Sequence, residues 1–184
     1  MSGNKTLKQN KPVVQRLFFA LWPSVEIKQQ LIKLTKQVAK HSDGRRVRDD
    51  NLHLTLRFLG SVTEDKQKCI EQIANDIQFE PFELILDQLV FRKKQEMVWL
   101  TTDNAIPDSL QNMVEQLETG VQECGFAPEK YPFKPHITLI RKTRKTKELS
   151  GQVNLKWFAD AFVLVRSKTW QEGVEYSVVK EWKL

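Results

Sequence analysis

The sequence predicts an α+β fold made of two similar halves, and three observations lead to this prediction. Segments with apolar residues at helical spacing alternate along the 184 residues with shorter segments of strand-like alternation. Helices are intermixed with hairpin-type strands, which favours antiparallel pairing over a doubly wound parallel sheet. The pattern His-x-Thr-Leu occurs once in each half, at 53–56 and 136–139, and its recurrence predicts two lobes that face one another. No linker rich in Gly, Pro or Ser divides the chain, so we expect a flexible polar tail over 1–15 and one bilobal domain over 16–184.

The first half of the domain is predicted to run strand, helix, strand, helix. The apolar run 16–22 stops at a proline, which is typical of a short buried strand. A serine then offers an N-cap for an amphipathic helix over about 24–41. The strand 51–60 follows, and a threonine with acidic residues behind it can begin a second helix over 63–77.

The second half is predicted to contain a hairpin, a helix and three further strands. Charged residues between two apolar runs indicate the hairpin turn, and a proline marks the start of the helix. In order, the expected elements are the hairpin 82–91 with 96–102, the helix 107–125, and the strands 131–142, 157–167 and 174–184.

Composition and charge limit the class of protein. Hydrophobic residues make up 40% of the chain and charged residues 28%, which is typical of a globular protein and not of a disordered one. No apolar run reaches the ~18 residues of a membrane-spanning helix, and the first 15 residues lack the apolar core of a signal peptide. The net charge of +6, gathered in the segments 44–48 and 141–147, is compatible with a polyanionic partner or with solvated loops.

The two cysteines lie far apart in predicted helices, without the spacing of a metal site. Cys69 and Cys124 are therefore expected to be buried free thiols in a reducing cytoplasm, with a single disulfide between them as the alternative.

The repeated motif places the same two functional groups on one face of each strand. Side chains two residues apart in a strand point to the same side, so His53 and Thr55 share a face, as do His136 and Thr138. Two imidazoles facing one another can exchange protons with the attacking and leaving oxygens of a phosphodiester, and the hydroxyls can bind its free oxygens. Histidine suits both roles because its pKa lies near neutrality. A polar but non-catalytic strand face and a zinc site are the alternatives; two histidines with no acidic residue or cysteine in either motif are a poor ligand set for zinc.

The chain resembles the 2H phosphoesterase superfamily, which takes its name from two HxTx motifs. Within it, the sequence is similar to the bacterial and archaeal RNA 2′,3′-cyclic phosphodiesterases, also called LigT-like 2′-5′ RNA ligases. The resemblance covers nearly all of 16–184 and includes "RLFFAL", "NLHLTLRFLG", "VWL", "FKPHITLIR" and a C-terminal strand pair. It implies two antiparallel sheets facing a central cleft, with helices on the outside. It also implies hydrolysis of a terminal 2′,3′-cyclic phosphate on RNA to a 2′-phosphate without metal or other cofactor, and reversible joining of RNA ends through a 2′-5′ bond.

The resemblance also assigns roles to single residues. His53 matches the family's proton donor and His136 its proton acceptor, while Thr55 and Thr138 match the hydroxyls that contact the phosphate. Arg141 matches an arginine that members keep just beyond the second motif. Five residues separate Arg141 from His136, so it shares the catalytic face only if the strand ends or bulges near position 140. Arg57 has the same parity as His53 and Thr55 and is the second choice for a phosphate-binding cation.

The sequence is also compatible with other functions. The same residues could act on a 2′-5′ oligoadenylate or a small cyclic nucleotide, or the cleft could belong to a non-catalytic RNA-binding module. The expected partner is RNA with a 2′,3′-cyclic phosphate or 2′-5′ linked ends, with no membrane, and the expected protein is a cytoplasmic monomer because two lobes of one chain can supply both halves of a site.

Overall fold

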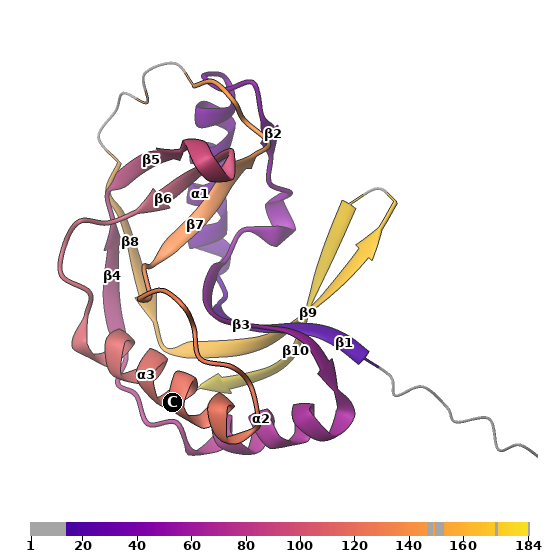
Figure 1. Ribbon diagram of the computed structural model, residues 1–184. Coiled ribbons are helices and arrows are strands. Elements are labelled where there is room, and N and C mark those ends of the chain that lie inside the picture. The colour runs from indigo at the N-terminus through magenta and orange to yellow at the C-terminus, as the bar shows by residue number, and fades with distance from the viewer. Residues whose placement is uncertain (1–13, 147–148, 150–152, 172, 184) are drawn as a thin grey trace, which may run out of the picture.

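The molecule is an α+β protein in which antiparallel strands form two lobes, as predicted (Figure 1). The computed structural model describes residues 14–146, 149, 153–171 and 173–183. The predicted tail lies largely outside the described residues, since these begin at Val14. Val14 and Gln15, which the prediction placed in the tail, belong to the first strand. No helix in the described part of the chain is long and apolar enough to cross a membrane.

One twisted antiparallel sheet runs through both lobes of the described chain. Its strand order is β10-β9-β1-β3-β7-β6-β5, and the short β2 also pairs with β7. The first lobe holds β1, β3, β9 and β10, and the second holds β2, β5, β6 and β7 (Figure 1). The strands of this sheet are β1 (Val14–Leu21), β2 (Arg45–Arg46), β3 (Leu54–Thr63), β5 (Gln88–Arg92), β6 (Met97–Thr101), β7 (His136–Arg141), β9 (Ala161–Trp170) and β10 (Gly173–Lys183).

The two lobes meet where β3 pairs with β7. Their register consists of a single pair, Leu54 opposite Ile137, and both side chains are fully buried. Each of these residues is the middle of a His-x-Thr triplet. The junction between the lobes therefore brings the two motifs together, although 83 residues separate them in the sequence.

Helices cover the outer faces of both lobes and bury the apolar faces of the strands. α1 (Val25–Ala39) packs against β7, whereas α2 (Glu64–Asp76) and α3 (Asp108–Glu123) pack against β3 and against each other (Figure 1). Ser24 caps α1 as predicted, because its hydroxyl accepts a hydrogen bond from the Ile27 amide at 3.3 Å. Thr63 stands at the start of α2 without a capping bond, and the acidic residues of the first turn suit the positive end of that helix.

The predicted run 82–91 is two strands rather than one arm of a hairpin. β4 (Phe82–Leu86) pairs with β8 (Leu155–Ala159) in a separate two-stranded sheet, and only β5 forms the hairpin with β6. The break falls at Asp87. The predicted strand 157–167 is divided in the same way, because β8 ends at Ala159 and β9 begins at Ala161.

The prediction of free thiols is wrong. Cys69 of α2 and Cys124, which caps the C-terminus of α3, form a disulfide with their Cα atoms 5.8 Å apart. The two helices pack side by side, and their contact brings together cysteines that are 55 residues apart in the sequence. Free thiols therefore no longer serve as an argument that the protein resides in a reducing cytoplasm.

Candidate active site

A cavity of about 290 Å³ lies at the junction of the lobes. The four motif residues His53, Thr55, His136 and Thr138 all line it; Thr55 lies in β3, His53 directly precedes that strand, and His136 and Thr138 lie in β7. The antiparallel pair Leu54–Ile137 joins the two motifs at the central residue of each His-x-Thr triplet, and so brings their four polar side chains to one cavity. The remaining lining residues are Val47, Asn51, Gln95, Met97, Trp99 and Arg141.

The backbone fixes the orientation and the tautomer of His53. Its Nδ1 lies 2.7 Å from the Asn51 carbonyl oxygen, which can only accept a hydrogen bond, so Nδ1 carries a proton. Nε2 lies 3.1 Å from the Thr55 hydroxyl. In the neutral ring the hydroxyl donates to Nε2, and Nε2 is the nitrogen that can take up or release a proton toward the cavity.

His136 is held in the same way from the other lobe. Its Nδ1 donates to the Lys134 carbonyl oxygen at 2.9 Å, which leaves Nε2 available. The indole of Trp99, on the neighbouring strand β6, stacks on the imidazole with 3.9 Å between ring centroids. Each histidine is thus anchored by the carbonyl two residues before it, so the local geometry of the two motifs matches.

Burial and neighbouring positive charge make both imidazoles weaker bases. Burial lowers the pKa of His53 to about 4, and the positive charges of Arg141 and His136 act in the same direction. Burial also lowers the pKa of His136, and the charges of Arg92 and Arg141 add to this effect. In the absence of an anion, both rings are therefore neutral near pH 7.

Arg141 reaches the cavity because β7 contains the bulge that its position requires. Thr138 pairs with Trp99 and Ile140 with Val98, so Leu139 has no partner of its own. Leu139 and Ile140 are both buried in the core, which shifts the alternation by one residue. The guanidinium of Arg141 consequently lies on the same face as His136 and Thr138 and lines the cavity.

The prediction that Arg57 shares the face of His53 and Thr55 is wrong, for the same physical reason. Ala20 pairs with Thr55 and Phe19 with Arg57, so β3 bulges at Leu56 and Arg57 turns toward the helices. Its side chain is buried and forms ion pairs with Glu118 of α3 and with Glu129, each at 2.6 Å. Arg57 is not among the residues that line the cavity and is dropped as a candidate for phosphate binding.

Sequence reasoning did not single out the aromatic residues around His53. Its ring lies between Phe18, at 4.8 Å between centroids, and Trp22, which stacks at 5.7 Å, while Tyr176 approaches edge-on at 5.1 Å. These residues come from β1, the loop after it and β10, and nothing in their local patterns distinguishes them from core residues. Asn51 was missed as well; its side-chain amide donates to the Val174 carbonyl oxygen at 2.7 Å and ties the motif to β10.

The carboxylate and thiolate ligands that many metals need are absent from this cavity. The lining residues offer imidazole, hydroxyl, amide and guanidinium groups but no acidic side chain. Within the described ranges, no three His, Cys, Asp or Glu side chains form a cluster that could hold a metal ion. The donor set suits binding of an anion better than binding of a cation.

Comparison with known proteins identifies the family. The model of the LigT like Phosphoesterase family matches the chain twice, over residues 21–99 and 100–176, with one HxTx motif in each match. The RNA 2′,3′-cyclic phosphodiesterase of Escherichia coli (strain K12) is 32% identical over 171 residues, which cover 92% of this chain and 97% of that protein. The enzyme of the same description from Archaeoglobus fulgidus is 28% identical over 80% of this chain and 83% of its own length.

Solved structures agree with the sequence relationships. The crystal structure of E. coli LigT complexed with 3′-AMP superposes with a TM-score of 0.84 at 33% identity, covering 94% of this chain and 99% of that one. The crystal structure of TT0787 of Thermus thermophilus gives a TM-score of 0.79 at 26% identity, over 92% and 97% of the two chains. The two matched halves, the bilobal fold and the paired HxTx motifs lead to one conclusion: the chain belongs to the LigT-like phosphoesterase family of the 2H phosphoesterases.

Proposed function

We propose that this protein is an RNA 2′,3′-cyclic phosphodiesterase that opens a terminal 2′,3′-cyclic phosphate to a 2′-phosphate. The observation that carries the proposal is the convergence of His53 and His136, each with a threonine, on one cavity of about 290 Å³. The curated description of the relatives in Escherichia coli and Archaeoglobus fulgidus as RNA 2′,3′-cyclic phosphodiesterases supports this choice of substrate.

In the proposed reaction, His136 acts as the base and His53 as the acid. Nε2 of His136 removes a proton from a water molecule as the water oxygen bonds to phosphorus. The bond between phosphorus and the 3′ oxygen breaks, and Nε2 of His53 gives its proton to that oxygen, leaving a free 3′ hydroxyl and a 2′-phosphate. The lowered pKa of His136 keeps its ring neutral and ready to accept a proton near pH 7.

His53 needs a proton before it can act as the acid, although burial lowers its pKa to about 4. The bound phosphodiester supplies the missing counter-charge. Its negative charge offsets that of Arg141 and stabilises an imidazolium beside it, so substrate binding raises the pKa of His53. Proton uptake at His53 is therefore coupled to binding of the anion.

The threonines and Arg141 stabilise charge on the phosphate. In the transition state, negative charge grows on the two phosphate oxygens that do not take part in bond exchange. Thr55 and Thr138 offer hydroxyl donors to these oxygens, and Arg141 offers a permanently charged donor. We propose that the reaction needs no metal, because these donors already provide the electrostatic stabilisation and because the cavity lacks carboxylates.

The same residues can transfer the phosphoryl group to RNA instead of water. When the 5′ hydroxyl of a second RNA attacks phosphorus, His136 takes its proton, the bond to the 3′ oxygen breaks as His53 protonates that oxygen, and a 2′-5′ bond forms. In the reverse reaction the 3′ hydroxyl attacks phosphorus, the 5′ oxygen leaves, and the two histidines exchange roles. We propose this reversible ligation as a secondary activity.

Two alternative functions would use the same site. The enzyme could act on a 2′-5′ oligoadenylate or a small cyclic nucleotide, or the site could bind RNA without turnover. Both complete motifs, with each Nε2 free to move a proton, favour catalysis over binding alone.

Incubation of the purified protein with 2′,3′-cyclic AMP, with and without EDTA, tests the proposal. We expect 2′-AMP as the product at the same rate in both samples. His53→Ala and His136→Ala should each lower the rate by about 10²- to 10⁴-fold while the circular dichroism spectrum stays unchanged. His41→Ala is the matched control, because His41 is exposed and lies outside the cavity. Full turnover in either motif variant, or 3′-AMP as the only product, would overturn the proposal.

A further inference from the structure

Three basic segments from separate parts of the chain meet at one edge of the second lobe. β2 pairs with the end of β7, with Arg45 opposite Arg141. The loop after β7 reaches the β5–β6 turn, where the Thr143 amide donates to the Glu96 carbonyl oxygen at 3.0 Å. We call the exposed cations of these segments the basic face; its members are Arg45, Arg46, Arg48, Lys93, Lys94, Lys142, Arg144 and Lys145.

The fold holds the basic face in place. The Asp43 carboxylate accepts hydrogen bonds from the Thr143 hydroxyl at 2.8 Å and from the amides of Arg144 and Lys145 at 2.9 and 3.1 Å. The Val47 amide donates to the Leu139 carbonyl oxygen at 2.9 Å. These bonds attach the segment 43–48 to the loop after β7, so the fold itself holds the cations of the two segments close together.

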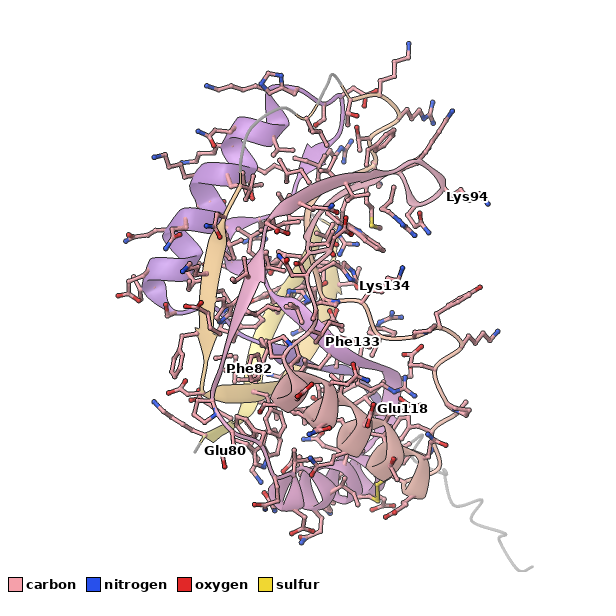
Figure 2. All side chains as sticks on the ribbon, turned by 90° about the vertical axis from the view of Figure 1, so that its left-hand side faces the viewer. Glu80, Phe82, Lys94, Glu118, Phe133 and Lys134 are labelled. Atoms are coloured by element: carbon pink, nitrogen blue, oxygen red, sulfur yellow. A yellow bond between two sulfur atoms is a disulfide. The ribbon has the colours of Figure 1, made fainter. Side chains whose placement is uncertain are left out.

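The basic face carries more positive charge than the neighbouring carboxylates neutralise. Arg46 pairs with Asp49 at 3.2 Å and Arg144 with Glu96 at 3.4 Å. Within the described ranges, the other six cations of the face have no carboxylate within ion-pair distance. Figure 2 shows Lys94 at the outer end of the β5–β6 turn, with its side chain directed to solvent on the side opposite α1.

The basic face is continuous with the active-site cavity. Val47, which lines the cavity, lies between Arg46 and Arg48, and Gln95 follows Lys94. Arg141, which directly precedes the third basic segment, also lines the cavity. On the other side of the cavity, Phe18, Trp22 and Tyr176 surround His53. A chain of phosphates that leaves the cavity over the second lobe meets the positive charge of the basic face.

We infer that the basic face binds the phosphates of an RNA strand upstream of its terminal cyclic phosphate. This inference rests on the proposed function and makes it more specific: the substrate is an oligonucleotide, and a mononucleotide uses only the cavity. Three contacted phosphates would give a slope of about −2 for the logarithm of the binding constant against the logarithm of salt concentration.

The test uses one cation from each segment. The variant Arg48→Gln, Lys94→Gln, Lys145→Gln is compared with a control of equal charge change, Lys33→Gln, Lys36→Gln, Lys156→Gln, whose residues lie on α1 and β8. Binding of a fluorescent hexanucleotide ending in a 2′-phosphate is measured by anisotropy between 50 and 300 mM salt, and turnover is measured with 2′,3′-cyclic AMP and with the cyclic-phosphate hexanucleotide.

For the basic-face variant, we expect at least about tenfold weaker hexanucleotide binding at low salt, a salt slope reduced toward zero, and cyclic AMP turnover within twofold of wild type. The control variant should retain the wild-type slope. Equal losses in both variants, or a wild-type slope near zero, would overturn the inference. Failure of the wild-type protein to hydrolyse either substrate would overturn the proposed function instead, and the binding measurement would still decide whether the face holds RNA.

Discussion

The imidazole of His53 couples the stability of the molecule to pH. Its pKa is about 4 in the folded protein, below the ordinary value of 6.5 in the unfolded chain. As pH falls through this interval, the unfolded chain takes up the proton first, so stability that is fully present above pH 6.5 is lost as pH approaches 4. The pKa of His136 is lowered as well and acts in the same direction.

We therefore expect His53→Gln to flatten the pH dependence of stability. The free energy of unfolding, measured in urea at pH 7.5 and at pH 4.5, should fall less in the variant than in the wild type, by up to about 3 kcal/mol. Carboxylates titrate equally in both proteins and cancel in the comparison. Parallel losses in the two proteins would show that His53 is not held neutral by its surroundings.

The bulges in β3 and β7 decide which side of each strand faces the cavity. Simple alternation places Arg57 in the site and Arg141 outside it, and one unpaired residue in each strand reverses both placements. In β3 the consequence is a buried guanidinium that connects the strand to α3 and to the segment 127–129, through Glu118, Glu129 and the Ala127 carbonyl oxygen.

Replacing Arg57 with Met should therefore affect stability more than catalysis. The change removes two ion pairs but leaves Glu118 and Glu129 partly exposed to water, so we expect a loss of about 1–3 kcal/mol in the free energy of unfolding. Turnover of 2′,3′-cyclic AMP should stay within about threefold of wild type, whereas Arg141→Met should lower it by about 10² or more. A large loss of turnover in an Arg57→Met variant that remains folded would contradict this expectation and indicate that Arg57 contributes to the active site.

The disulfide between α2 and α3 gives a second expectation at the level of elements. Cys69 and Cys124 close a loop of 55 residues, and the chain-entropy model assigns such a loop roughly 4 kcal/mol of stabilisation. The double variant Cys69→Ser, Cys124→Ser should unfold at lower urea concentration than the oxidised wild type. Dithiothreitol should lower the midpoint of the wild type toward that of the variant and leave the variant unchanged; an equal midpoint in all samples would mean that the thiols are not paired.

Periodicity was sufficient to predict the helices and most of the strands. α1, α2 and α3 each bury one apolar stripe, and that stripe is visible in the local sequence. The split of 82–91 into β4 and β5 was not predictable in this way, because β4 ends opposite the first residue of its partner β8, which lies far along the chain in the second half. The grouping of His53, Thr55, His136 and Thr138 around one cavity was predictable from the repeated motif, but bulges, aromatic neighbours and the disulfide depend on contacts between distant segments.

At the scale of the whole molecule, one chain supplies both halves of the site. His53 comes from the first lobe and His136 from the second, and the pair Leu54–Ile137 joins the lobes within the same chain. We propose a monomer on this basis. Mixing the inactive variants His53→Ala and His136→Ala should therefore restore no hydrolysis of 2′,3′-cyclic AMP, even at high concentration. Recovery of about a quarter of the wild-type rate would instead reveal a site shared between exchanged lobes.

The matched bulges at Leu56 and Leu139 have a consequence for substrate polarity. Each turns the residue two places beyond it away from the core, but this residue is Arg141 in one lobe and the half-exposed Phe58 in the other. A duplicated pair of histidines and hydroxyls would by itself accept a phosphodiester in either of two opposite orientations. Arg141 is the one Lys or Arg side chain among the described residues that line the cavity, and it comes from the second lobe. We propose that it breaks this degeneracy, so that one ribose oxygen, rather than either of the two, is presented to the acid.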